Sequence, residues 1–560
     1  MAAPAQVPRK VDVQLDTGLR RNVGSLSLLF TGVGAIIGSG WLFGALYAAQ
    51  IAGPAAILSW AIGGVLVMVI GLVYAELAVM FPVSGGIIRF PHYSFGSFAS
   101  FSSGWVSWLA AAAVTPIEVL ATTQYADPYL PWLMDSADGV FVLTPPGLAV
   151  AVVLMALYSV VNVLGVQLLT RLNNLLVWWK LAVIALVIVA FFLLAFHPEN
   201  LTAVGGFAPE GFGAVFAAIP AAGVAFAYLG FRNGVEFAGE TDNPQRNVPI
   251  AIIGSIVITA VIYVLLQVAF LTALPAETIA GGWTQLTFGE GEVAGPLAGL
   301  SLLLGAVWLA VLLRVDAVVS PADTGLIYAG VTTRLAYANA RNGNAPQALT
   351  KLNDRGIPWV SVLVMFIVGC LFFLPFPGWQ QFIGFITSAF AISFGAGPLV
   401  VGALRRQLPD QERRFRVPGG DVLPYLAFLA SGLLVFWAGW AINEKMFIAL
   451  LVGYVVFAAY SAYAKDRMPP LELRAGSWFP LWVVGLAVIS FLGDVDPGTP
   501  ADPGLVLDGG DGPLDLVWGL VAVAVWSAVI YAYAMAVRLP PARAAANISQ
   551  LPTDEPEARA

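Results

Sequence analysis

Fourteen apolar segments, most of them about 20 residues long or longer, follow one another between residues 23 and 537. A helix needs roughly 20 mostly apolar residues to cross the hydrocarbon core of a bilayer, so each segment suffices for one crossing. Hydrophobic residues make up 59% of the 560-residue chain and charged residues only 11%, too little charge for the surface of a soluble protein. The sequence therefore predicts an all-α integral membrane protein with about 14 transmembrane helices.

The predicted spans alternate with more polar connections. They cover residues 23–50, 54–80, 98–126, 145–165, 172–196, 212–239, 249–273, 300–335, 358–376, 380–404, 422–442, 446–464, 477–493 and 514–537. The eighth is the least simple of them, because residues 295–337 form a stretch too long for one straight crossing.

Basic residues lie almost entirely on one side of these spans. All but four of the 26 Lys and Arg residues fall in alternate segments, the first being residues 1–22 and the last 538–560. The last segment on the opposite side is acidic and contains Asp494, Asp496, Asp502, Asp508 and Asp511. Because loops rich in Lys and Arg resist translocation, we expect a cell-membrane protein with both termini in the cytoplasm.

The first span contains GAIIGSGWLFG (34–44), in which four of the eleven residues are glycine. Backbone groups exposed to hydrocarbon cost several kcal/mol each, so a helix opens inside a membrane only where protein or a cavity covers the opening. An opening at Gly38–Ser39–Gly40 would present the amides of a helix N-terminus, which suit a carboxylate. Close helix packing through small residues is the alternative explanation.

The sixth span is irregular in the same way. In AGVAFAYLGFRNGVEFAGE (222–240), Gly230 and Gly234 flank Arg232 and Asn233. Paired interruptions at corresponding places in two halves of a chain indicate an inverted-repeat transporter with its site near the bilayer midplane. Amides from one opening and carbonyls from the other would suit the carboxylate and the ammonium group of an α-amino acid.

Four stretches together resemble the amino acid–polyamine–organocation (APC) superfamily of transporters. They are GAIIGSGWLFG (34–44), YAELAVMFPVSGGIIRF (74–90), AFAYLGFRNGVEFAGETDNPQRNVPIAI (225–252) and TTRLAYANARNGNAPQALTKLNDRGIP (332–358). The resemblance implies a LeuT-type fold that works by alternating access. Its parts would be a tail (1–22), two inverted five-helix repeats (23–196 and 212–404), four additional helices (422–537) and a second tail (538–560).

The resemblance also implies a substrate site of backbone groups. The amides around Gly38, Ser39 and Gly40 would receive the α-carboxylate. The α-amino group would meet carbonyl oxygens of Ile36, Phe226, Ala227 and Leu229, and Phe226 would act as an aromatic outer gate.

Two further residues indicate which branch of the superfamily this chain resembles. Many relatives carry an acidic residue after the Gly-Phe of the sixth span, where this chain has Arg232. With Glu118 in TPIEVLATTQYA (115–126), the sequence is more similar to the aspartate–proton symporter branch. Arg232 would then bind the side-chain carboxylate of aspartate or glutamate through its planar fork of donors. The alternative is a structural i,i+4 pair between Arg232 and Glu236.

Ionisable residues inside spans normally face a partner or a cavity. Lys180, Arg232 and Arg314 balance Glu118, Glu236 and Asp316 in number, which predicts a paired interior network. Lys180, Glu118, Asp316 and Glu236 are the candidates for proton coupling, Lys180 chiefly because it resembles the fifth-helix lysine of proton-coupled relatives. Structural alternatives remain for Lys180, as a fixed cation that joins helices, and for Glu118, as a buried partner of a cation. Glu76 and Glu240, at inner helix ends, are interpreted as anchors beside Arg89 and Arg246.

The sequence indicates a secondary active transporter and not an enzyme, because it has no H-E-x-x-H motif, no P-loop and no dinucleotide fingerprint. Its single cysteine, Cys370, excludes an intrachain disulfide, and its two histidines are too few for a metal cluster. The expected partners are an amino acid, protons and the lipid bilayer, without a cofactor, a metal or nucleic acid. Proton-coupled uptake of aspartate or glutamate is the leading hypothesis. A neutral amino acid symporter or exchanger, a polyamine carrier and a non-transporting nutrient sensor are the alternatives, and the oligomeric state stays open.

Overall fold

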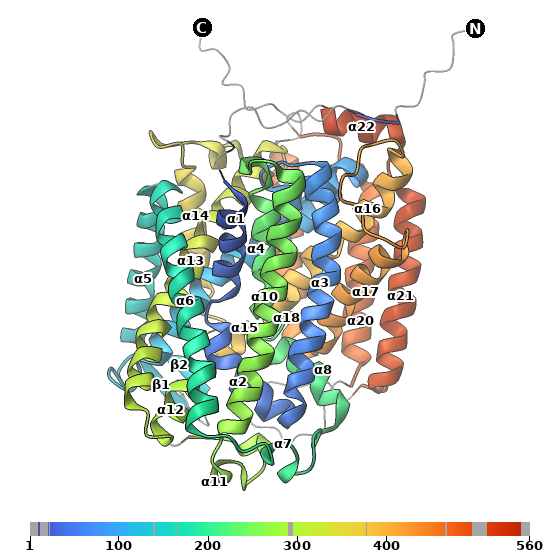
Figure 1. The fold of residues 1–560 in the computed structure, drawn as a ribbon. Helices are drawn as coiled ribbons and strands as arrows, with labels where there is room; N and C mark the ends of the chain where they lie inside the picture. The colour runs from blue at the N-terminus through green and yellow to red at the C-terminus, as the bar shows by residue number, and fades with distance from the viewer. Residues whose placement is uncertain are drawn as a thin grey trace, which may run out of the picture.

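The computed structural model describes residues 9–11, 21, 23–137, 140–164, 166–288, 295–376, 378–464, 468–494 and 512–549. Long helices lie roughly side by side and run between two ends of one bundle (Figure 1). Helix α22 (Pro541–Ser549) and the start of α1 (Ser25–Ile36) lie at one end, called here the α22 end. The hairpin of β1 (Met134–Ala137) and β2 (Val140–Leu143) lies at the other, called here the hairpin end, and is a small departure from an all-α chain.

The helices of the first predicted repeat are α1, α2 (Gly40–Ala52), α3 (Ala56–Met80), α4 (Gly86–Ala126), α5 (Pro145–Leu164) and α6 (Val166–Leu194), with a 3-10 turn η1 (Gly53–Ala55). Between the two predicted repeats lies α7 (Asn200–Ala203). The second repeat contains α8 (Gly211–Ala221), η2 (Phe226–Arg232), α9 (Asn233–Glu236), η3 (Ala238–Glu240), α10 (Pro244–Ala273), α11 (Ala276–Ile279), η4 (Trp283–Gln285), α12 (Pro296–Leu303), α13 (Val307–Arg341), η5 (Gln347–Thr350), α14 (Trp359–Leu371), α15 (Trp379–Phe394) and α16 (Ala396–Gln407). Beyond them follow α17 (Val422–Trp437), α18 (Trp440–Tyr463), α19 (Leu473–Gly476), α20 (Trp478–Leu492), α21 (Leu516–Val537) and α22.

Each of the fourteen predicted spans overlaps at least one of these helices, several of which extend beyond the predicted bounds. Within the described residues, nine helices are long and apolar enough to cross a membrane, and a tenth crossing is formed by the bent pair Gly211–Ala221 and Phe226–Glu236. That number counts Gly40–Met80 as one unit, although α2 and α3 meet at Gly53, whose φ is 57°. It also leaves out shorter apolar helices such as α1, α14 and α17. The long eighth segment consists of the short α12 and the 35-residue α13.

Both predicted interruptions are present. The first span breaks between Ile36 and Gly40, inside the glycine-rich stretch. The sixth breaks at residues 222–225, where the chain bends by 49° and continues as the 3-10 helix η2. This second break lies before Gly230 and Gly234, so the sequence placed it several residues too late. Gly223, with a φ of 78°, provides the conformation that the bend needs.

The additional C-terminal helices pack along one side of the bundle, where the orange-to-red ribbons α17, α20 and α21 gather (Figure 1). Gly432 of α17 approaches Val523 of α21, so these two helices lie close together. Helix α22 caps the α22 end, where Asn547 donates to the carbonyl oxygen of His92 at 3.0 Å. These contacts attach the last helices firmly to the preceding bundle.

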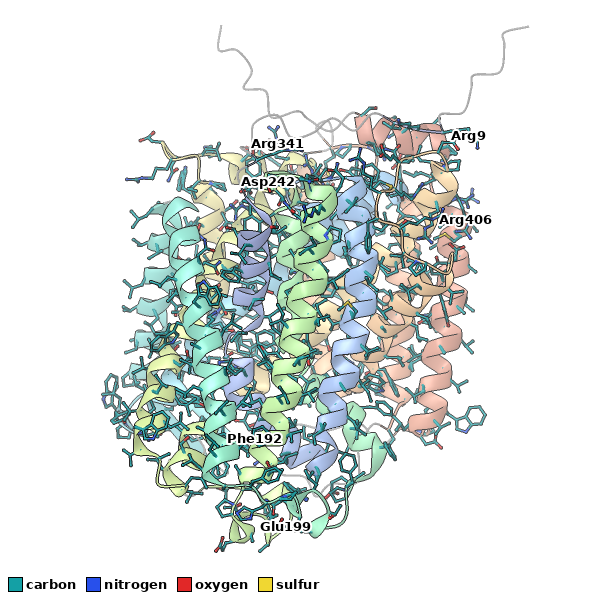
Figure 2. The ribbon with its side chains drawn as sticks, viewed as in Figure 1. Arg9, Phe192, Glu199, Asp242, Arg341 and Arg406 are labelled. Atoms are coloured by element: carbon teal, nitrogen blue, oxygen red, sulfur yellow. The ribbon has the colours of Figure 1, made fainter. Side chains whose placement is uncertain are left out.

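Charged side chains concentrate at the two ends of the bundle. Arg9, Asp242 and Arg341 lie at the α22 end, and Glu199 lies at the hairpin end (Figure 2). Of the acidic loop residues named above, Asp496, Asp502, Asp508 and Asp511 lie outside the described residues.

Candidate functional site

The break in the first span presents one amide to a carboxyl group of the protein itself. Ser39 N donates to Oε2 of Glu118 on α4 at 2.8 Å, and both residues are fully buried. Gly38 lies so close that a Cβ there would come within 2.5 Å of Glu118 Oε1 and 3.0 Å of the Thr324 side chain. The glycine therefore makes room for the Glu118 carboxyl group at the start of α2, where a carboxylate was predicted to bind.

The two breaks touch each other through backbone. A Cβ on Gly230 of η2 would lie 2.5 Å from the carbonyl carbon of Ala35 and 2.5 Å from Ile36 N. A Cβ on Gly40 would lie 3.1 Å from the Cβ of Ala227. Since real Cβ atoms do not approach backbone this closely, glycine at position 230 allows η2 to lie directly against the end of α1.

The predicted acceptors for an amino group are more occupied than expected. The Ile36 carbonyl oxygen accepts from Gly38 N at 3.0 Å and from the Tyr263 hydroxyl at 3.1 Å. Phe226, Ala227 and Leu229 lie in η2, and a 3-10 helix uses its carbonyl oxygens in i→i+3 bonds. All four residues are buried at or beside the breaks, so the structure brings them together without showing free carbonyls.

Lys180 of α6 joins three helices. Its Nζ donates to the Gly34 carbonyl oxygen at 2.7 Å and to Thr324 Oγ1 at 3.1 Å, and it pairs with Asp323 Oδ2 at 2.8 Å. Gly34 belongs to α1, and Asp323 and Thr324 belong to α13. All three ammonium N–H groups thus have acceptors, which matches the structural alternative of a cation that joins helices.

Asp323 is the functional candidate that the sequence reasoning missed. It was visible in the sequence as a charged residue within the eighth predicted span, and it is 2% exposed. Its pairing with Lys180 gives the lysine a carboxylate partner that was not predicted from the sequence.

Arg232 is fully buried between the sixth span and its neighbours. Its Nη2 donates to Ser107 Oγ of α4 at 2.8 Å and to Glu236 Oε1 at 3.2 Å, and its guanidinium carbon lies 5.1 Å from the ring centre of Phe390. The i,i+4 pair with Glu236 is therefore present. Nε and Nη1 of Arg232 and Oε2 of Glu236 have no hydrogen-bond partner among the described residues, so the guanidinium retains donors for a further acceptor.

Asp316 and Arg314 point away from each other, as their spacing on α13 implies. Asp316 is buried and its Oδ1 accepts from Trp179 Nε1 and from Ser320 Oγ, each at 2.8 Å. Arg314 is only partly buried, and its Nη1 donates to the hydroxyl of the exposed Tyr129 at 2.7 Å. Asp316 thus connects α13 to α6, and Arg314 is not part of the interior.

The predicted three-to-three charge balance is therefore wrong. Around the two breaks, the described chain buries two basic residues and four carboxyl groups. They are Lys180, Arg232, Glu118, Glu236, Asp316 and Asp323. Uncompensated charge in a low-dielectric interior is costly, so a surplus of carboxyl groups is an arrangement suited to holding protons.

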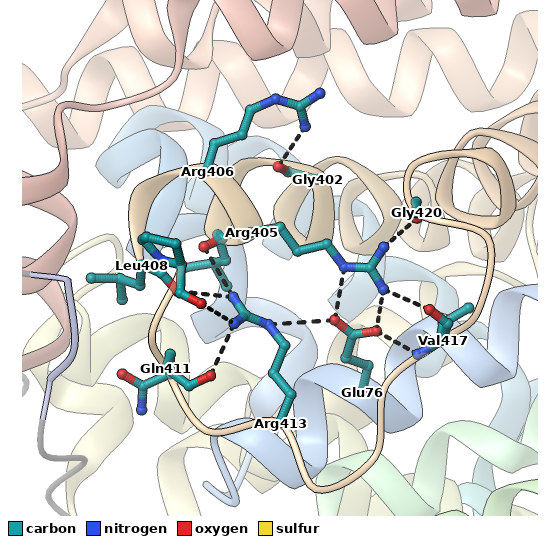
Figure 3. Close-up of polar contacts among 11 residues, drawn as sticks. Glu76, Gly402, Arg405, Arg406, Leu408, Gln411, Arg413, Val417 and Gly420 are labelled. Carbon is teal, nitrogen blue, oxygen red and sulfur yellow. Dashed lines mark hydrogen bonds and ion pairs between the residues drawn. The ribbon is translucent and has the colours of Figure 1, made fainter.

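A second buried ion cluster lies toward the α22 end (Figure 3). The Glu76 carboxylate accepts from Arg405 Nε at 3.1 Å, Arg405 Nη2 at 2.6 Å and Val417 N at 2.8 Å, and Arg413 Nε lies 3.7 Å away. The cluster anchors the connection between α16 and α17 to the end of α3. The interpretation of Glu76 as an anchor is thus supported, but its partner is Arg405 and not Arg89.

Glu240 differs from expectation in the same way, because its ion pair at 3.5 Å is with Arg334 of α13 and not with Arg246. Both pairs bring together residues distant in sequence.

The sequence matches the family described as "Amino acid permease" over residues 23–492. It is 37% identical to the glutamate/serine transporter AimA of Bacillus subtilis over 92% of this chain and 94% of that protein. It is 34% identical to the aspartate-proton symporter of the same organism, over 93% and 98% of the two chains. The branched-chain amino acid permease BcaP of Bacillus subtilis is 28% identical, over 80% and 94%.

Proposed function

The chain belongs to the amino acid permease family, and from that premise we propose that it imports an acidic amino acid together with protons. Membership makes it a multi-pass membrane transporter of amino acids with the all-helical LeuT-type fold, and not an enzyme. The α22 end would face the cytoplasm, because the basic segments of the sequence lie on the side of the termini.

One observation, the environment of Arg232, supports the proposal that the substrate is acidic. Arg232 is a fully buried guanidinium that follows the second break, and among the described residues its Nε and Nη1 have no hydrogen-bond partner. Each of these two donors can donate to one oxygen of a further carboxylate, and a second carboxylate distinguishes aspartate and glutamate from other amino acids. The glutamate/serine transporter and the aspartate-proton symporter to which this chain is 37% and 34% identical point the same way.

A small neutral amino acid is the second candidate. Glu236 already pairs with Arg232, which lowers the need for a substrate carboxylate there. The name of the 37% identical relative also includes serine.

We place the α-carboxylate at the Ser39 amide, which Glu118 occupies here. Two carboxylates cannot share one amide donor, so the substrate would bind there after Glu118 takes up a proton and leaves. Proton binding would thereby favour substrate binding, which is the coupling that a symporter requires. Asp323 of the Lys180–Asp323 pair precedes Gly325 by two residues on α13, and a Cβ on Gly325 would lie 3.6 Å from the Cβ of Glu118. This pair is therefore the second candidate proton site.

Uptake into liposomes tests the proposal. Purified protein should accumulate labelled aspartate when an inward proton gradient is imposed, and a protonophore should abolish the accumulation. Unlabelled glutamate should compete and leucine should not. If alanine or leucine competes as well as glutamate, the acidic-substrate proposal is wrong; if serine alone is accumulated, the second candidate replaces it.

A charge-removing variant tests the role of Arg232. Arg232→Gln combined with Glu236→Gln removes the fork without leaving an unpaired buried carboxylate. The loss of charged hydrogen bonds should raise the KM for aspartate by about tenfold or more and leave that for serine nearly unchanged. Arg314→Gln, at a partly exposed position outside the buried network, is the matched control and should change neither.

A further inference from the structure

Trp379 covers the break of the first span from the direction of the hairpin end. It is the first residue of α15, it is fully buried, and its Nε1 donates to Ser39 Oγ at 2.8 Å. The preceding Gly378 leaves no room for a side chain beneath the Phe141 carbonyl of β2. The start of α15 therefore lies between the hairpin and the break.

Beyond that hydrogen bond, the indole ring of Trp379 packs against aromatic side chains of α2. Its ring centre lies 4.7 Å from Phe43, and it stacks on Tyr47 at 5.7 Å with an interplanar angle of 23°. Ser39, Phe43 and Tyr47 follow one another at intervals of four residues, so they form one stripe on α2. Because α2 runs from the break toward the hairpin end (Figure 1), Trp379 packs against α2 on the hairpin side of the break.

Gly223, at the second break, also lies against the indole ring of Trp379. A Cβ on Gly223 would lie 3.2 Å from Trp379 Cη2 and 3.0 Å from the Ile383 side chain, and Gly223 has a φ of 78°. A residue with a side chain would be strained here and would push against the indole. One side chain of α15 thus rests on both interrupted spans.

We propose that Trp379 is the gate between the amino acid site and the hairpin end, and that its hydrogen bond to Ser39 ties closure of the gate to occupancy of the carboxylate site. Ser39 offers its amide to a carboxylate and its hydroxyl oxygen to the indole N–H. A carboxylate that orders Ser39 therefore also orders the acceptor of Trp379. Phe226, which the family resemblance suggested as the outer gate, lies beside Gly40, where a Cβ would come within 3.4 Å of its ring. The proposal rests on the proposed function only for the identity of the ligand.

Cysteine labelling tests the gate. Phe43→Cys in a Cys370→Ser background places a single thiol under the indole, and a membrane-impermeant methanethiosulfonate reagent is added from the hairpin side. Trp379→Phe keeps the ring and removes the N–H, and should speed labelling about fivefold, the value of one buried hydrogen bond. Trp379→Ala should speed it further. Trp283→Phe, which removes a comparable buried indole bond to the Val204 carbonyl, is the control and should leave the rate unchanged.

The second part of the experiment measures whether added amino acids protect the thiol from labelling. Aspartate should slow labelling in the parent and protect clearly less in Trp379→Phe, because the link between Ser39 and the gate is lost. Equal labelling rates in the parent, Trp379→Phe and Trp379→Ala would overturn the gate, as would an equal increase in Trp283→Phe. Protection by serine but not by aspartate would leave the gate intact and refute the acidic substrate. Each variant is first checked for a monodisperse elution profile, so that misfolded protein does not enter the comparison.

Discussion

Replacing Arg405 with methionine should destabilise the protein far more than the same change at its neighbour Arg406. Arg405 donates to both oxygens of the Glu76 carboxylate, which is fully buried. Breaking a buried ion pair by removing one partner typically costs about 3–5 kcal/mol, because the remaining charge stays in a low-dielectric site. The Arg406 pair with Asp421 is more than one-third exposed on both sides, and such pairs contribute about 1 kcal/mol or less.

One hydrogen-bond donor and one ion-pair partner of Glu76 remain in the Arg405→Met variant and reduce the expected cost. Val417 N still donates at 2.8 Å, and Arg413 Nε lies 3.7 Å away. Burial lowers the pKa of Arg413 and the Glu76 carboxylate opposes that shift, so Arg413 is already partly desolvated and compensates only in part. We therefore expect a loss of about 2–3 kcal/mol for Arg405→Met, below the full cost of an orphaned charge.

Thermal unfolding of the detergent-solubilised protein, followed by size-exclusion fluorescence, measures the difference. Arg405→Met should lower the midpoint by several degrees relative to the parent, and Arg406→Met by no more than about one degree, since large proteins shift less per kcal/mol. Glu76→Gln added to Arg405→Met should recover most of the loss, because removing both charges is tolerated better than removing one. Equal losses for Arg405→Met and Arg406→Met, or no recovery in the double variant, would refute the reasoning.

Three further variants probe the breaks. Glu118→Gln should lose proton-driven accumulation while retaining exchange of substrate across the membrane, as measured by counterflow in liposomes; intact accumulation would exclude Glu118 as the carrier. Lys180→Ala should destabilise the protein by about 3 kcal/mol, because it leaves the buried Asp323 carboxylate without its cation. Adding Asp323→Asn should restore thermal stability if the loss of this ion pair causes the destabilisation. Gly230→Ala should abolish uptake or folding, since its Cβ would meet backbone at 2.5 Å, whereas Gly24→Ala, which meets nothing within 4 Å, should have little effect in the same assays.

Local chemistry made much of this protein predictable. A bilayer crossing needs a fixed length of apolar chain, so the number and order of the spans follow from hydrophobicity alone. Glycine clusters such as Gly38–Ser39–Gly40 loosen a helix wherever they stand, so the first break was predicted at its observed place. The second was predicted in the right span but too late, because Gly223 carries the bend while Gly230 serves contact with α1.

The partners of the charged residues could not be predicted from the sequence. Interior charges could be counted in the sequence, but the side of a helix that faces protein depends on which helices pack against it. Arg314 and Asp316 illustrate this, since they lie two residues apart on α13 and only Asp316 is buried. The same packing joins Lys180 to Asp323 and Glu76 to Arg405 across large sequence separations, which no local pattern specifies.

The sequence by itself determined that this chain is a helical membrane protein with two interrupted spans, because hydrophobic length and glycine act within one segment. Only the tertiary structure decided that Glu118 occupies the Ser39 amide and that Trp379 lies over the same residue. Those contacts join α4 and α15 to the first break, and they exist only because two separate helices are brought to within hydrogen-bond distance of one serine.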